Sequence, residues 1–301
     1  MHLAVLLWGF TGVLGKAISL NALVLVWYRM ALTAVFMAVI LSYRKQWAKI
    51  TPRDLRYLLL VGCLIGLHWI GFYGAIKYAN ASIALICLST ASVFTALLDP
   101  LVNKGKYDRT EFLLGLLALA GVYLIYRYEL TLGVGILLGT IAAILSAVFT
   151  VLNKRIAHKY PSRTIVFYEM TTGWGLITLL LPLQFYLFPA STMFPAIGNA
   201  WWQNDWIWLV ILSLCCTVWA QSLALSALKK LSSFTVTLTV NLEPVYGILL
   251  AFFIYHENKE LQTGFYYGMG LICLSVLLQM IRLLKPKNAV AGFVKDKGGI
   301  D

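Results

Sequence analysis

The sequence predicts an all-α polytopic membrane protein, with ten transmembrane helices arranged as two inverted five-helix repeats. First, the 301 residues are 60% hydrophobic and only 12% charged, whereas soluble domains carry about 25% charged residues. Second, the apolar residues form ten runs, each of about the 20 residues that cross a bilayer. Third, short segments of the first half recur in the same order in the second half. These observations exclude a soluble fold.

The ten apolar runs define the elements in order. We predict spans at residues 3–20, 22–42, 55–77, 80–102, 109–127, 131–152, 164–187, 206–228, 232–255 and 262–283. The net charge of +12 is interpreted by position, because membrane proteins keep Lys and Arg in cytoplasmic loops. With the N-terminus inside, 19 Lys and Arg fall on the cytoplasmic side and 4 on the outer side. We therefore expect both termini in the cytoplasm.

Three pairs of segments carry the internal repeat. Because each unit has five spans, an odd number, the second unit enters the membrane in the opposite direction. Inverted repeats are typical of secondary transporters, which bind substrate near the bilayer midplane. We expect one repeat at 1–128, a second at 129–284, and a disordered cytoplasmic tail at 285–301. The matched segments are Gly12–Ile18 with Thr150–Ile156, Trp27–Met30 with Phe167–Met170, and Gly74–Phe94 with Ser226–Tyr246.

Several of these motifs together resemble the EamA family of the drug/metabolite transporter superfamily. They are the pair Trp8-Gly9, Arg29 in the second span, and the string LEPVYGILLAFFIYHE at 242–257, followed by a glycine-rich last helix. The resemblance covers about residues 3–283. It implies ten helices, an inverted repeat, and export or exchange of small metabolites, and we expect the chain in the bacterial cytoplasmic (inner) membrane.

The two repeats differ at positions that carry chemistry. Ser92 stands where Pro244 stands in the second repeat, and Gly105 stands where Glu257 stands. Arg29 matches Glu169. The halves are therefore chemically asymmetric, and they are not expected to bind substrate alike.

Glu243 is the first candidate site residue. An acid near the bilayer centre costs about 2.5–3.5 kcal/mol on insertion scales, and the neighbouring Pro244 removes a backbone hydrogen bond that lipid cannot replace. Both are tolerated where a wet cavity or other helices surround them. Glu243 is interpreted as a proton carrier or a ligand for a cationic group. The alternative is a structural acid paired with a nearby Lys or Arg.

Arg29 and Glu169 lie about two turns into their spans. The guanidinium fork of Arg29 suits a substrate carboxylate. An intramembrane arginine also often ties helices together, so this alternative stays open. Glu169 is a candidate for a second titrating group.

Further substrate-binding candidates are aromatic, amide and hydroxyl side chains near mid-depth. The aromatic residues offer stacking surfaces, and His68 adds a titratable imidazole. The alternative is ordinary helix packing, with Ser and Thr bonded back to their own helices. These candidates are Trp8, Tyr28, His68, Trp69, Phe72, Ser89, Ser92, Tyr168, Trp219, Gln221, Thr239 and Asn241.

No catalytic, nucleotide-binding or metal-ligand motif occurs, so an enzyme, a cofactor and a nucleic-acid partner are not expected. The predicted function is secondary active transport of amino acids or similar zwitterionic or aromatic compounds, outward, by alternating access around a central cavity. The expected partners are the small-molecule substrate and the lipid bilayer, with protons as a candidate coupling ion. The chain is expected to be a monomer or a homodimer. A membrane scaffold or receptor without transport is the alternative.

Overall fold

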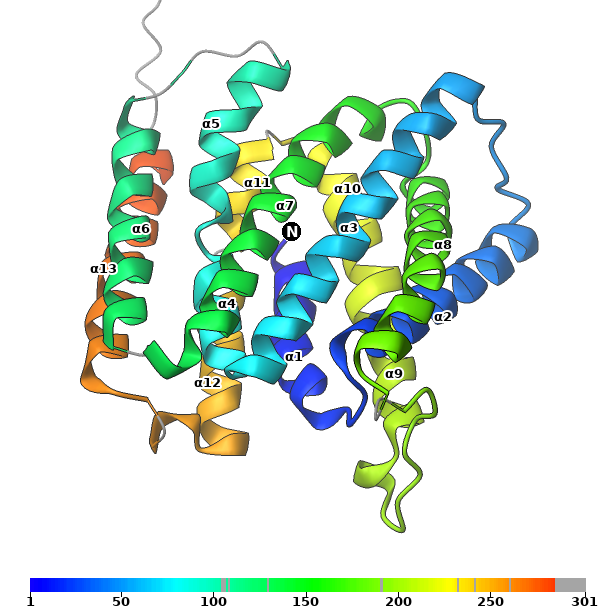
Figure 1. Cartoon of the computed structure of the whole chain (residues 1–301). Helices are drawn as coiled ribbons and strands as arrows, with labels where there is room; N and C mark the ends of the chain where they lie inside the picture. The colour runs from blue at the N-terminus through cyan, green and yellow to red at the C-terminus, as the bar shows by residue number, and fades with distance from the viewer. Residues whose placement is uncertain are drawn as a thin grey trace, which may run out of the picture.

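Helices make up nearly the whole of the described chain (Figure 1). The computed structural model describes residues 1–103, 107, 109–128, 130–189, 192–231, 233–240, 242–259 and 261–284. Within these ranges there is no β-strand, only an isolated bridge between Ile197 and Asn204. The predicted tail at 285–301 and residue Asn241 lie outside the described residues.

The helices follow one another with short connections. The longest connection in the described ranges leads from α8 to α9 and forms the hairpin at the bottom of Figure 1. The α-helices are α1 (His2–Ala17), α2 (Ala22–Tyr43), α3 (Pro52–Tyr78), α4 (Ala81–Leu88), α5 (Ala91–Asn103), α6 (Arg109–Tyr128), α7 (Gly133–Ala157), α8 (Ser162–Leu187), α9 (Asp205–Ser213), α10 (Ala220–Leu228), α11 (Ser233–Val240), α12 (Glu243–Tyr255) and α13 (Thr263–Leu284).

Many of these helices are long and apolar enough to cross a membrane. Seven segments of the described chain qualify, and each of them overlaps one of the predicted spans: Ala22–Tyr43, Pro52–Tyr78, Ala81–Asn103, Gly133–Ala157, Ser162–Leu187, Asp205–Leu228 and Thr263–Arg282. Three shorter apolar helices, at His2–Ala17, Phe112–Tyr128 and Glu243–Tyr255, accompany them. The prediction of an all-helical, multi-pass membrane protein is confirmed, and the count of ten spans in inverted repeats stays a prediction.

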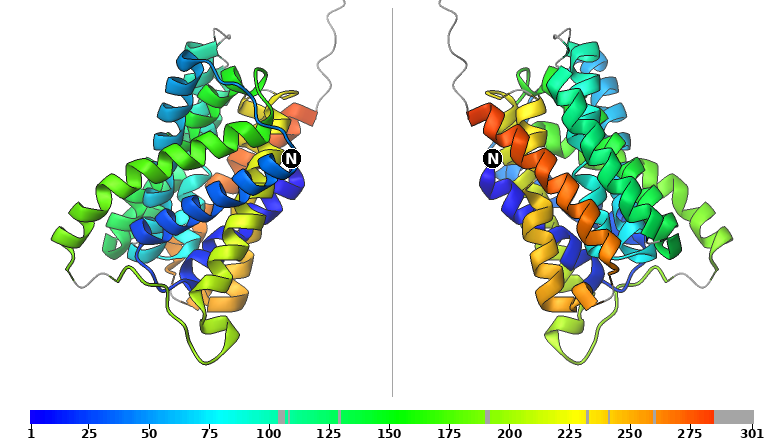
Figure 2. Two further views of the ribbon diagram at one scale, coloured as in Figure 1. Left: turned by 90° about the vertical axis from the view of Figure 1, so that its right-hand side faces the viewer. Right: turned by 90° about the vertical axis from the view of Figure 1, so that its left-hand side faces the viewer.

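The centre of the molecule is built by α3, which packs against both α7 and α8. At one edge, α6 and α13 lie side by side (Figures 1 and 2). Their close approach depends on glycine, because a Cβ at Gly268 would lie 2.5 Å from the carbonyl oxygen of Gly121. Small residues let membrane helices pack closely in this way.

The fourth predicted span, 80–102, is broken into α4 and α5, and the sequence analysis did not predict this break. The hydroxyls of Ser89 and Thr90 donate to the carbonyls of Ile86 and Cys87, each at 2.6 Å. Short-range bonds of this kind compete with the helical ladder and allow a break without proline. In the ninth span Pro244 lies in the first turn of α12, where its missing N–H costs nothing.

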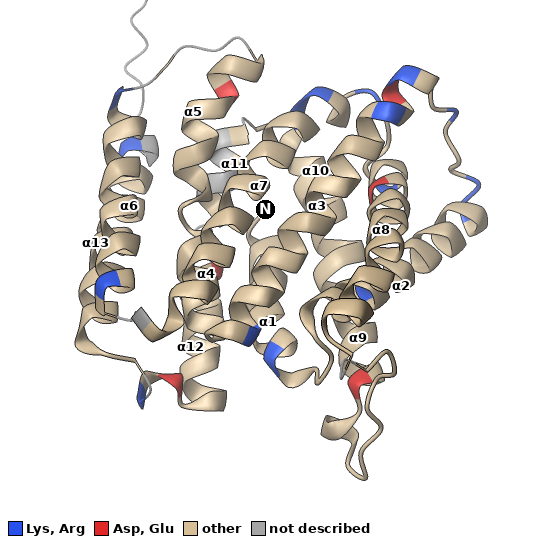
Figure 3. Cartoon of the chain, viewed as in Figure 1, with Lys and Arg blue, Asp and Glu red and all other residues tan. Residues whose placement is uncertain are grey.

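Lys and Arg lie mostly toward one end of the molecule, drawn at the top of Figure 3. This is the end where α3 begins and α7 ends (Figure 1). The opposite end carries fewer positive side chains.

Candidate functional site

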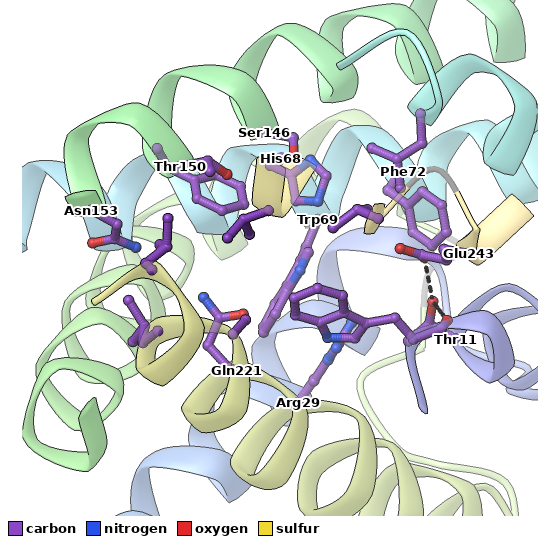
Figure 4. A pocket seen from close by; sticks show the side chains of 18 residues that line it. Thr11, Arg29, His68, Trp69, Phe72, Ser146, Thr150, Asn153, Gln221 and Glu243 are labelled. Carbon is purple, nitrogen blue, oxygen red and sulfur yellow. Dashed lines mark hydrogen bonds between the residues drawn. The ribbon is translucent and has the colours of Figure 1, made fainter. Parts of the chain in front are cut away.

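A narrow cavity lies between the two halves of the chain (Figure 4). Its volume is about 80 Å³, several times the roughly 10–15 Å³ that one water needs. Its walls combine aromatic, amide and hydroxyl side chains with a guanidinium group, an imidazole and one carboxyl group. The lining residues are Trp8, Thr11, Arg29, His68, Trp69, Phe72, Leu88, Ser146, Phe149, Thr150, Asn153, Gln221, Ala224, Leu225, Leu228, Val236, Val240 and Glu243.

Arg29 is built into the cavity wall. Its side chain is 1% exposed, and Nε donates to Thr217 Oγ1 at 2.8 Å while Nη1 donates to the Tyr73 hydroxyl at 2.7 Å. The guanidinium also stacks on Trp69, with Cζ 3.7 Å from the ring centroid. Arg29 therefore ties α2 to α3 and to the segment that follows α9, as the helix-tying interpretation predicted. Binding of a substrate carboxylate by Arg29 stays a prediction.

A π-helical turn, η3 (Leu214–Trp219), provides acceptors for this wall. The carbonyl oxygen of Cys216 accepts from Trp8 Nε1 at 3.0 Å and from Arg29 Nη2 at 3.3 Å. Single π-helical turns inside α-helices occur frequently at functional sites. The turn connects α1 and α2 of the first half to the second half through one backbone carbonyl.

Glu243 begins α12 and is 4% exposed. Its Oε1 lies 3.5 Å from Thr11 Oγ1, whereas the same hydroxyl is only 2.6 Å from the carbonyl of Trp8. Because a hydroxyl has one proton to donate, the shorter contact takes it. No Lys or Arg nitrogen of the described chain lies within 4 Å of the carboxylate. Glu243 therefore faces the cavity without a strong donor, at a helix N-terminus that favours negative charge.

His68 forms part of the aromatic side of the cavity. Its Nδ1 lies 2.8 Å from the carbonyl oxygen of Ala142, which can only accept, so Nδ1 carries a proton. Its ring lies 5.3 Å from that of Phe149 and 6.4 Å from that of Phe72. In the neutral imidazole Nε2 is then an acceptor.

The structure brings part of the predicted site together. The predicted residues that line the cavity are Trp8, Arg29, His68, Trp69, Phe72, Gln221 and Glu243. The sequence also indicated Thr239, which lies half-buried in α11 outside the cavity lining.

Other predicted aromatic residues lie elsewhere. Tyr28 packs edge-on against Trp206, and Tyr168 packs against Phe167. Trp219 is 59% exposed on the outside of its helix. Near-uniform hydrophobicity around these helices leaves no periodic signal to tell the inward from the outward face.

The remaining predicted polar residues are not in the cavity lining. The Ser89 hydroxyl donates to Ile86, and the Ser92 hydroxyl donates to the carbonyl of Ser89 at 3.2 Å, as the alternative for hydroxyl residues predicted. Glu169 is buried in α8. Asn241 lies outside the described residues.

The sequence analysis did not identify the residues by which α7 lines the cavity. Ser146, Phe149, Thr150 and Asn153 line the cavity from this helix. Thr150 and Asn153 are polar residues at i, i+3 spacing in an apolar helix, and they share a face. They also belong to the segment that matches Gly12–Ile18 in the repeat, which was a usable signal.

Within the described ranges, no group of three or more His, Cys, Asp or Glu could hold a metal ion. The cavity contains instead the groups that recognise organic molecules: aromatic faces, amides, an acid and basic side chains.

Comparison with known proteins identifies a family whose model matches this chain twice. The model of the EamA-like transporter family matches residues 1–127 and again residues 133–281.

The chain belongs to the EamA-like transporter family. This EamA-like protein is a multi-pass membrane transporter, and membership points away from an enzyme. An uncharacterized transporter of Haemophilus influenzae is 23% identical over 89% of each chain. An uncharacterized transporter of Bacillus subtilis is 23% identical over 97% of this chain and 91% of its own. One from Archaeoglobus fulgidus is 26% identical over 63% of this chain and 64% of its own.

A solved crystal structure has the same fold as this EamA-like protein. It superposes with a TM-score of 0.66 over 94% of this chain and 96% of its own, at 16% identity. At this identity the likeness concerns the fold alone.

Proposed function

We propose that this EamA-like protein is a secondary active transporter that works by alternating access. Two inverted five-helix halves, 1–128 and 129–284, rock around the cavity, so that it opens to one side of the membrane at a time. The observation that carries this proposal is the cavity itself. Both halves line it, and it holds a buried acid, Glu243, that lacks a strong donor.

The inverted arrangement is supported by the double match of the family model and by the helix contacts. The principal contacts between the halves have counterparts under an exchange of equivalent helices. The contact α3–α7 corresponds to α10–α1, and α3–α8 corresponds to α9–α2. Likewise α5–α7 corresponds to α12–α1, and α4–α12 corresponds to α11–α5, while α2–α8 and α6–α13 join equivalent helices directly. A pseudo-two-fold axis accounts for this pattern.

The cavity extends from Glu243 to Asn153 near the end of α7 (Figure 4). That helix ends on the side where Lys and Arg gather (Figure 3). Because cytoplasmic loops are enriched in Lys and Arg, we assign this side to the cytoplasm. Both termini would then lie in the cytoplasm, and the expected location is the bacterial inner membrane.

The cargo is a small zwitterionic or aromatic compound, with amino acids as the first candidates, and the proposed direction is outward. Trp8, Trp69 and Phe72 provide stacking surfaces, and Glu243 suits an ammonium group. Arg29 has five N–H groups, of which three are used by protein acceptors. Its remaining N–H groups are available to a substrate carboxylate.

Counterflow in proteoliposomes tests this function. Vesicles preloaded with unlabelled amino acids should take up labelled amino acid without any gradient, and Glu243→Gln should lose that exchange or its pH dependence. Nucleosides and sugar phosphates serve as comparison cargoes. No exchange of any member of the panel by well-folded protein would contradict transport and favour a scaffold or receptor.

A further inference from the structure

Glu169 is a buried acid that forms no ion pair with any residue that the structure describes. It lies in α8 and is 0% exposed, with its backbone packed closely against Gly62 of α3. Neither carboxyl oxygen accepts a hydrogen bond from a residue that the structure describes. The side chain that interacts with it is the amide of Asn153 on α7, and Asn153 Oδ1 also has no donor.

Asn153 offers this acid both a donor, the Nδ2 amide group, and an acceptor, Oδ1. An ionised carboxylate can only accept hydrogen bonds, and a buried charge without a partner is strongly unfavourable. In the described part of the chain the ion pairs are Lys16–Glu257 and Lys159–Asp54, so neither neutralises Glu169. A proton on the carboxyl removes the buried charge, and the acid then has an O–H to donate to Asn153 Oδ1.

The helices packed against α8 offer no counter-charge. Arg29 of α2 donates to Thr217 and Tyr73. Tyr57 and His68 of α3 donate to the carbonyls of Leu152 and Ala142, and Cys63, the other titratable group near Gly62, is half-buried. Lys154 of α7 donates to backbone carbonyls at Leu228 and Leu231. Helix α10 carries no titratable residue.

The two repeats differ in charge and hydrogen bonding at one pair of equivalent buried positions. Arg29 and Glu169 occupy equivalent positions in the segments Trp27–Met30 and Phe167–Met170. Arg29 makes three hydrogen bonds with neutral acceptors, whereas Glu169 makes none with described donors. The second half therefore has a buried carboxyl group where the first half has a fixed positive charge.

We propose that Glu169 and Asn153 form a proton-binding site beside the cytoplasmic end of the cavity. In the occupied state the Glu169 O–H donates to Asn153 Oδ1. On release, the O–H bond breaks, the proton passes to water, and the carboxylate is left ionised. Asn153 also lines the cavity, at the end away from Glu243 (Figure 4), so it links the acid to the aqueous path. The coupling role of this proton rests on the proposed transport function, but the existence of the site does not.

Infrared difference spectroscopy of the purified protein in lipid tests the site directly. A pH titration should reveal a protonated-carboxyl band that is lost on raising the pH and is absent from Glu169→Gln. The band should persist in Glu243→Gln, the matched change at the other cavity acid. In Asn153→Leu, which removes the acceptor, the band should shift in frequency. A band that Glu169→Gln leaves unchanged, or that never titrates, overturns the proposal.

Transport assays then test the coupling. In Glu169→Gln, counterflow should persist while uptake driven by a proton gradient falls at least tenfold. Gradient-driven uptake equal to that of the wild type overturns the coupling role. If the wild type transports nothing while the infrared band titrates, the transport function fails and the proton site stands. Should Glu169→Gln fail to fold, the frequency shift in Asn153→Leu decides the assignment.

Discussion

Lys16 Nζ lies 2.9 Å from Glu257 Oε1, and this ion pair joins the end of α1 to the segment that follows α12. The same carboxylate accepts from the backbone N–H groups of Ala81 and Ser82 and from the Ser82 hydroxyl. It therefore also binds the N-terminus of α4, where negative charge is favourable. We call Lys16, Ala81, Ser82 and Glu257 the end latch.

The other end of the molecule is tied differently. Lys154 matches Lys16 in the repeat, but Gly105 stands where Glu257 stands. Lys154 donates to the carbonyls of Leu228 and Leu231 instead. In the proposed orientation the ionic end latch lies on the outer side, and we expect it to hold that side closed.

Glu257→Gln should weaken the end latch by about 1–2 kcal/mol, because a charge-assisted network becomes a neutral one. Outward opening should then rise about fivefold to thirtyfold. The measurement is the labelling rate of Thr11→Cys, with the native cysteines replaced, by an impermeant thiol reagent added outside. Lys159→Gln, which removes the ion pair with Asp54, is the control and should change nothing. Equal labelling rates with and without Glu257→Gln would show that the latch does not hold this end.

The end latch should withstand mild acid. Burial raises the pKa of Glu257, but the hydrogen bonds from Ser82 and Lys16 lower it by more than burial raises it. The pKa of Glu257 therefore lies below its ordinary value of 4.5. A group with a lowered pKa stabilises the fold above its unfolded pKa and loses that contribution as the pH falls through the folded pKa. Only the thiolate reacts, so the labelling rate of Thr11→Cys is divided at each pH by the rate of the same variant unfolded in denaturant. This ratio should stay constant at neutral and weakly acidic pH and rise only below about pH 4.5. A rise already near neutral pH would assign the gating to another group.

Arg29→Lys should destabilise the protein, because lysine cannot reproduce the fork that reaches Thr217, Tyr73 and Cys216. Each hydrogen bond to a charged group contributes about 1.5–3 kcal/mol, so the melting temperature should fall by several degrees. Arg163→Lys is the control, since Arg163 makes an exposed hydrogen bond to Gln46. Thermal unfolding in detergent measures both. An unchanged melting temperature with lost transport would instead assign Arg29 to substrate alone.

Gly62→Ala should separate α3 from α8. The added methyl group would overlap the Glu169 carbonyl and the Thr172 hydroxyl, and overpacking costs about 1–3 kcal/mol. Gly175→Ala is the matched control and should be neutral, because no atom lies within 4 Å of the place that its added methyl group would take. Thermal unfolding distinguishes the two, and equal stability of both variants would contradict the close packing.

Hydropathy and charge predicted where the apolar helices lie, because the cost of exposing backbone in lipid imposes long apolar runs. Glu243, Arg29 and Gln221 could be identified as site residues because they are polar and lie inside apolar spans. Burying such side chains is unfavourable unless a cavity or hydrogen-bond partners surround them. The inward face could not be predicted in the eighth span, where Trp219 and Gln221 lie two residues apart and point to different surroundings. The break at Ser89 could not be predicted, because it accompanies local hydroxyl bonds that Ser and Thr also make in unbroken helices. The π-helical turn could not be predicted either, because its carbonyl at Cys216 is held by tertiary hydrogen bonds from Trp8 and Arg29.

The most direct test of the central claim is substrate protection of Gln221→Cys, compared with Trp219→Cys. Gln221 lines the cavity, whereas Trp219 is 59% exposed on the outside of the same segment. In proteoliposomes, with the native cysteines replaced, a transported amino acid should slow the labelling of Gln221→Cys and leave Trp219→Cys unaffected. Protection at neither position, or equally at both, would contradict substrate binding in the cavity between the two halves.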